Sequence, residues 1–69
     1  MSETIRVNGE EHSLRVGTVE ELLRAKEIDP AARGVAVAVN GTVVPRREWL
    51  STAVRNGDEV EIVRPFAGG

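Results

Sequence analysis

The stretch TVEELLRAKEIDP at residues 18–30 contains the one clear helical pattern of this chain and decides how it folds. Thr18, followed three positions later by Glu21, matches the capping-box pattern of a helix start. Apolar residues then recur from Val19 at the i, i+3, i+4 spacing of one helix face. Because the closing Asp-Pro pair disfavours continuation, we expect the helix to end near residues 26–28.

Two alternating runs precede this helix. Residues 4–8 and residues 11–16 alternate polar and apolar side chains on either side of an Asn-Gly pair, with Leu14 and Val16 on the apolar face of the second run. Two such runs around Asn-Gly are the strongest short-range signal of a β-hairpin. The chain therefore begins with two predicted antiparallel strands.

Two further strands follow the helix. Residues 35–39 (VAVAV) are apolar throughout, with large and small side chains on opposite faces. Asn40-Gly41 predicts a turn into a short strand at residues 42–44, which Pro45 ends.

A connector and a last strand complete the chain. Residues 46–54 predict a connector with a helical turn or two, which Trp49, Leu50 and Val54 have the spacing to pack onto the core. Residues 59–64 alternate again and predict a fifth strand.

The resulting order, β-β-α-β-β-β, predicts an α+β fold in which one helix covers one face of a mixed sheet of about five strands. The crossover through the helix should be right-handed and place two strands parallel. We therefore predict a ubiquitin-like β-grasp roll at residues 1–64, followed by a flexible C-terminal tail at residues 65–69.

The alternation also predicts which side chains face away from the helix. The positions expected to face the helix are Ile5, Val7, Leu14, Val16, Val37, Val39, Val60 and Ile62. Those expected on the outer face are Arg6, Arg15, Ala36, Ala38, Glu59, Glu61 and Val63. Two interpretations stay open. The face is either solvated, with weak cross-strand Arg–Glu pairs, or a partner-docking face formed by Arg6, Ala36, Ala38, Glu61 and Val63.

Composition argues against several classes of function. The 69 residues include no cysteine, which removes disulfides, thiolate metal sites and a cysteine nucleophile. No apolar run approaches the roughly 20 residues of a membrane span, and no signal peptide is visible at the N-terminus. We expect a cytoplasmic protein. The net charge of −2 and the scarcity of aromatic residues argue against a nucleic-acid partner.

The sequence shows no set of residues suited to catalysis. His12 is the only histidine and has no evident catalytic partner. The acidic residues are dispersed, and the glycines in turns form no phosphate loop. We expect neither an enzyme, nor a metal site, nor a stably bound cofactor.

The tail ends in Phe66-Ala67-Gly68-Gly69. Two residues without Cβ fit a channel too narrow for side chains, although ordinary fraying would also explain them. Residues 65–69 can reach at most about 16–18 Å when extended, which is enough to enter a partner's active site. Phe66 either anchors the tail or packs back on the domain. The carboxylate of Gly69 is then the main reactive candidate, provided that a partner activates it by adenylation.

Four segments carry a resemblance to a known family: residues 35–41, 43–49, 56–62 and 67–69. They resemble the ThiS family, the sulfur carriers of thiamine biosynthesis. The most specific part is the Val-Pro-Arg-x-x-Trp segment at residues 44–49. The ending Arg64-Pro65-Phe66 is also similar to the small subunit of molybdopterin synthase. A sulfur carrier of another pathway would have the same fold and the same reactive tail, so that it is a further alternative.

The resemblance implies a protein that acts as a substrate and not as a catalyst. A ubiquitin-activating-type, ThiF-like adenylyltransferase would use ATP and magnesium to adenylate Gly69. A cysteine desulfurase or a rhodanese would supply the sulfur of a thiocarboxylate, and a ThiG-like thiazole synthase would receive it. Phe66, Ala67, Gly68 and Gly69 would enter the partner, and Arg46, Arg47 and Trp49 would be structural or partner-facing. A ubiquitin-like modifier and an inert β-grasp interaction module are the alternatives.

Overall fold

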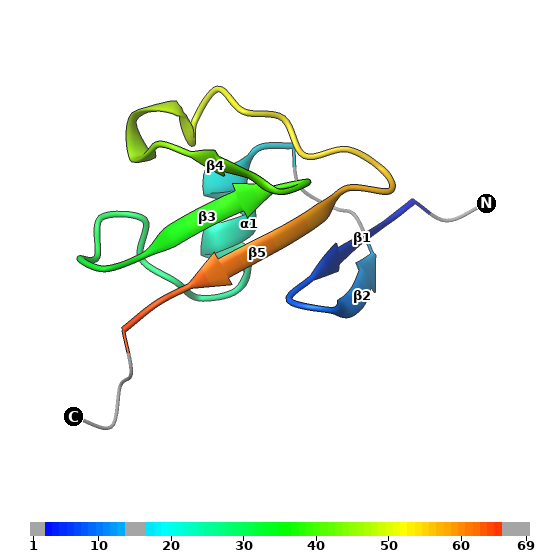
Figure 1. The fold of residues 1–69 in the computed structure, drawn as a ribbon, viewed down its shortest axis with the longest axis horizontal. Helices are drawn as coiled ribbons and strands as arrows, with labels where there is room; N and C mark the ends of the chain where they lie inside the picture. Colours follow the sequence, from blue (N-terminus) through cyan, green and yellow to red (C-terminus); the bar gives the residue numbers. More distant parts are fainter. Residues whose placement is uncertain (1–2, 14–16, 66–69) are drawn as a thin grey trace.

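The computed structural model describes residues 3–13 and 17–65. Its elements follow the predicted order (Figure 1). They are β1 (Thr4–Val7), β2 (Glu10–Ser13), α1 (Val19–Ala25), β3 (Ala36–Val39), β4 (Thr42–Val44), the 3-10 helix η1 (Arg46–Glu48) and β5 (Glu59–Val63).

The five strands form one mixed sheet in the order β2-β1-β5-β3-β4. β1 pairs with β5 in parallel, and the other neighbours are antiparallel. Figure 1 shows α1 behind this sheet, with the connector between β4 and β5 passing along its upper edge. One helix on one face of a mixed sheet is the predicted β-grasp arrangement, and this prediction is confirmed.

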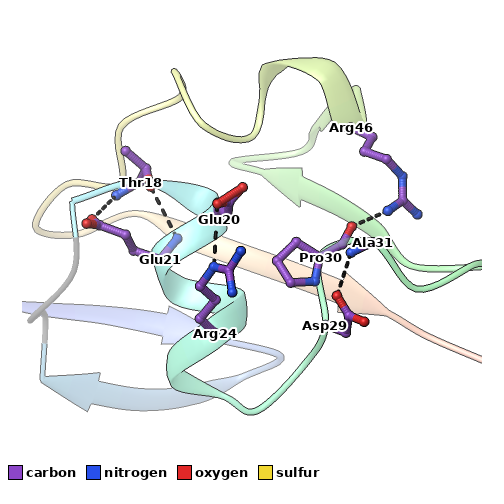
Figure 2. A network of polar contacts seen from close by, with 8 residues as sticks. All are labelled: Thr18, Glu20, Glu21, Arg24, Asp29, Pro30, Ala31 and Arg46. Carbon is purple, nitrogen blue, oxygen red and sulfur yellow. Dashed lines mark hydrogen bonds and ion pairs between the residues drawn. The ribbon is translucent and has the colours of Figure 1, made fainter.

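Helix α1 begins where the capping box predicts. The Thr18 hydroxyl accepts a hydrogen bond from the backbone N–H of Glu21 at 3.2 Å. The Glu21 carboxylate accepts in return from the backbone N–H of Thr18 at 3.1 Å (Figure 2). These bonds satisfy N–H groups that have no partner within the helix.

The helix ends earlier than predicted, at Ala25. The N–H of Glu27 donates to the Arg24 carbonyl and the N–H of Ile28 to the Leu23 carbonyl. This is the Schellman pattern, in which the chain reverses through a residue in the left-handed region. Here that residue is Glu27, with φ of 62°. The chain has thus already left the helix before Asp29-Pro30.

The core lies between α1 and the inner face of the sheet. Its buried side chains are Ile5, Val7, Val19, Leu22, Leu23, Ile28, Val35, Val37, Val44, Trp49, Val54, Val60 and Ile62. The predicted inward positions in the sheet are confirmed for all described members, although Val39 is only half-buried. Leu14 and Val16 lie outside the described residues.

The connector forms one helical turn, η1, and packs through Trp49 and Val54. The prediction that Leu50 packs as well is wrong, because its side chain is 68% exposed. Neighbouring residues on such a turn point in directions roughly 120° apart, so that Trp49 and Leu50 cannot both face the core. Trp49 takes the inward position. No helix within the described ranges is long and apolar enough to cross a membrane.

Candidate functional site

The predicted reactive tail starts at the end of a central strand. Phe66, Ala67, Gly68 and Gly69 lie outside the described residues, so that their proposed role stays a prediction. The structure describes the chain up to Pro65, two residues beyond β5. Because β5 pairs with β1 on one side and β3 on the other, the tail leaves the sheet from a strand that is held on both sides.

An asparagine side chain extends this pairing toward the tail. The amide oxygen of Asn8 accepts a hydrogen bond from the backbone N–H of Ile62 at 2.8 Å. The amide nitrogen of Asn8 donates to the Ile62 carbonyl at 3.2 Å. Asn8 follows β1 with a positive φ of 50°, so that its side chain pairs with β5 where the β1 backbone has turned away. This role was not predictable from the sequence, in which Asn8-Gly9 indicated only a turn.

The structure brings together four of the five residues of the predicted docking face. Ala36 lies opposite Val63, and Ala38 lies opposite Glu61. These residues line a shallow hollow of about 290 Å³ on the sheet. We call it the outer hollow, and its lining is Asn8, Ala36, Val37, Ala38, Val43, Glu61 and Val63.

Arg6 does not line the outer hollow and is separated from it. Its partner in the parallel register is Glu59. Both residues line a different, polar hollow together with Glu11 and Asp58. Arg6 therefore lies at the polar hollow and not at the outer hollow, and whether it belongs to a docking face stays a prediction.

Val43 also belongs to this face, although it was not among the predicted docking residues. Its side chain is 71% exposed, and Val63, across the outer hollow, is 63% exposed. The signal was present in the alternation of β4, because a buried Val44 requires its neighbour Val43 to point outward. Two exposed valines beside two alanines give the hollow an apolar floor with Glu61 at its rim. Such a surface suits the apolar centre of a protein interface.

The described residues make two ionic contacts between side chains. His12 is half-buried, with Nε2 at 3.7 Å from the Glu10 carboxylate. The Arg–Glu pair within the described ranges, Arg24 with Glu20 at 3.5 Å, lies within α1 and not across strands (Figure 2). Among those same residues no group of three His, Asp or Glu side chains is placed to hold a metal ion.

Comparison with known proteins gives consistent results. The ThiS family model matches residues 4–69. The sulfur carrier protein ThiS of Escherichia coli (strain K12) is 38% identical over 52 residues, which cover 75% of this chain and 76% of that protein. The crystal structure of the thiamine biosynthesis protein ThiS from Geobacter metallireducens superposes with a TM-score of 0.77 at 33% identity, covering 96% of this chain and 99% of that one.

A second relative is a much longer protein. A thiazole synthase of Paramagnetospirillum magneticum is 41% identical over 64 residues. The match covers 91% of this chain but only 19% of that protein. A segment similar to almost the whole of this chain is thus present within a larger protein that is named for a thiazole-forming activity.

Proposed function

Since this chain belongs to the ThiS family, we propose that it is a sulfur carrier protein of thiamine biosynthesis and that the carboxylate of Gly69 carries the sulfur. The observation that supports the proposal most is the family match over residues 4–69, which spans the fold and the tail together. The sulfur carrier of Escherichia coli, at 38% identity, supports the same function. In this role the protein is a substrate of its partners and not an enzyme.

The chemistry takes place on the tail, within the partners. In the active site of a ThiF-like adenylyltransferase, a Gly69 carboxylate oxygen attacks the α-phosphorus of ATP, and pyrophosphate leaves with its magnesium. The acyl carbon of the adenylate is then open to attack by a persulfide sulfur, with AMP as the leaving group. A partner thiol attacks the donor-side sulfur of the resulting acyl disulfide, so that a disulfide forms on the partner and the thiocarboxylate leaves on Gly69.

The sulfur comes from outside the chain, because the sequence contains no cysteine. A cysteine desulfurase or a rhodanese would supply it as a persulfide. The role of Gly68, beside Gly69, is to keep the tail slim enough for a narrow channel. Phe66 and Ala67 precede it as the part of the tail that enters the partner.

The receiving enzyme in this proposal is a ThiG-like thiazole synthase. The support is the relative from Paramagnetospirillum magneticum, in which a similar segment forms part of a thiazole synthase. This relative favours the thiazole pathway over molybdopterin synthesis. We assign the outer hollow, with Val43 and Val63 exposed on it, as the surface that docks on such a partner.

Intact-mass spectrometry tests the proposal. The protein is incubated with ATP, magnesium, a ThiF-like enzyme and a persulfide source. We expect its mass to rise by the difference between sulfur and oxygen, and a variant that lacks Gly69 to show no change. An unchanged mass of the full chain, or an increase that persists without Gly69, would contradict the proposal.

A further inference from the structure

The C-terminal end of β5 makes a contact that continues its pairing with β3. Ala36 lies opposite Val63 in the antiparallel register of these strands. Continuing that register by two residues on each chain brings Pro65 opposite Gly34. A Cβ atom on Gly34 would lie 2.7 Å from Cγ and 3.2 Å from Cδ of Pro65. The proline ring therefore occupies the space that a side chain at residue 34 would need.

Each partner of this contact has a backbone property that suits it to its position. Gly34 has φ of +83°, in the region that glycine adopts without steric cost. Pro65 has no backbone N–H and a φ restricted by its ring, so that it cannot extend the sheet ladder. The pairing of β5 with β3 ends at Ala36 and Val63, and the Pro65 ring packs on Gly34 just beyond that pair, where the chain leaves the sheet.

The loop that carries Gly34 is itself bound to the connector. Arg46 donates a hydrogen bond from Nη1 to the Pro30 carbonyl (Figure 2). Its Nη2 donates to the Ala32 carbonyl. Its guanidinium lies over the ring of Trp49, 4.9 Å from the centroid. Trp49 is 2% exposed. A buried indole therefore orients Arg46, and Arg46 orients the loop on which the Pro65 ring packs.

We propose that Gly34 and Arg46 are positioning residues that direct the C-terminal tail into the active site of the adenylating partner. This inference rests on the proposed function, because the direction of the tail matters only if Gly69 must reach a reacting nucleotide. A tail that starts from a fixed point and direction samples a smaller volume than one that starts from a loose strand end. Its carboxylate is then at a higher effective concentration beside the nucleotide.

The chain offers a matched control for a substitution at residue 34. Gly41 has φ of +84°, and a Cβ atom there would meet nothing within 4 Å. Gly34→Ala and Gly41→Ala therefore introduce the same backbone strain, but only Gly34→Ala displaces the Pro65 ring. The two variants are compared at a temperature where circular dichroism shows both to be folded.

The measurement is ATP–pyrophosphate exchange by a ThiF-like adenylyltransferase as a function of the concentration of the full-length carrier. We expect Gly34→Ala to lower kcat by about tenfold relative to Gly41→Ala, with KM unchanged because the contact directs the tail and leaves the rest of the folded body as it is. Arg46→Ala should lower kcat in the same way. Equal kcat values for Gly34→Ala and Gly41→Ala would overturn the inference.

A double-mutant cycle tests the contact between Gly34 and Pro65 independently. Pro65→Ala removes the ring atoms that meet residue 34, so that it breaks the contact from the other side. We expect kcat of the combined variant Gly34→Ala with Pro65→Ala to be no lower than that of the slower single variant, because each change removes the same interaction. Losses that multiply would overturn the inference. If the unchanged protein supports no exchange at all, the proposed function fails and this inference fails with it.

Discussion

Among single residues, Trp49 and Arg46 show what the segment at residues 44–49, the part most specific to the ThiS family, does in the structure. By its resemblance alone, the Val-Pro-Arg-x-x-Trp segment is either structural or partner-facing. In the structure the Trp49 indole is buried, and its Nε1 donates to the Val44 carbonyl at 2.8 Å. Arg46 packs on the outer side of that ring. Both side chains therefore stabilise the connector and the loop before β3.

Trp49→Phe tests this structural role. Phenylalanine fills most of the buried volume but has no N–H, so that the Val44 carbonyl loses its donor. Leaving a buried acceptor without a partner costs about 1–3 kcal/mol, and we expect a loss of that size in urea unfolding. The neighbouring change Leu50→Ala should cost less than about 0.5 kcal/mol, because the side chain is exposed. Equal losses for the two variants would contradict the assignment.

Among the elements, α1 has a start that the sequence predicted and an end whose geometry it did not. The start was predictable because Thr18 and Glu21 are three positions apart and satisfy each other locally. The end was not, because a Schellman reversal is usually marked by glycine, and here Glu27 takes the left-handed position. Without that marker, only the later Asp-Pro pair was visible.

Glu27→Gly should therefore stabilise the protein. Glycine removes the clash that an L-residue has in the left-handed region, and it loses part of this gain to its greater freedom in the unfolded chain. We expect a net gain of about 0.5–1 kcal/mol in the free energy of unfolding. The control Ala25→Gly, inside the helix, should lose up to about 1 kcal/mol. A destabilised Glu27→Gly variant would show that the carboxylate side chain has a role that we have not identified.

The inward and outward positions along each strand were predictable for a different reason. Ile5, Val60 and Ile62 are buried as expected, because alternation assigns a whole strand once one face is apolar. The differences concern which residues lie together in the folded chain, and alternation along a strand does not determine this. Leu50 lies on a turn, where only packing decides which apolar neighbour turns inward. Arg6 is on the expected face, but the parallel register places it opposite Glu59, and both residues line the polar hollow.

In the whole molecule, the sheet has one face covered by α1 and an opposite face with an apolar hollow near the strand from which the tail departs. This arrangement places the proposed docking surface and the proposed reactive tail on one rigid element, since Glu61 and Val63 lie on β5 and Pro65 follows it. Docking on the outer hollow would thus fix the point from which residues 65–69 extend. Their reach of about 16–18 Å is then measured from that point.

Val43→Asp tests the docking surface. A carboxylate in the apolar floor of the hollow must be desolvated on binding, and we expect the Kd for a ThiG-like thiazole synthase to rise by at least about tenfold, or 1.4 kcal/mol. Leu50→Asp is the matched control, since Leu50 is almost as exposed, at 68% against 71%, but lies outside the hollow. Isothermal titration calorimetry gives both values. An equal effect of the two changes would exclude the outer hollow as the interface.

Localising the added mass within the chain tests whether Gly69 carries the sulfur. After incubation with ATP, the adenylyltransferase and a persulfide source, the protein is cleaved after Arg55, and the peptide of residues 56–69 is fragmented. We predict that the mass difference between sulfur and oxygen appears in this peptide and in every fragment that contains Gly69. Added mass on any other residue, or a peptide of unchanged mass, would contradict the account.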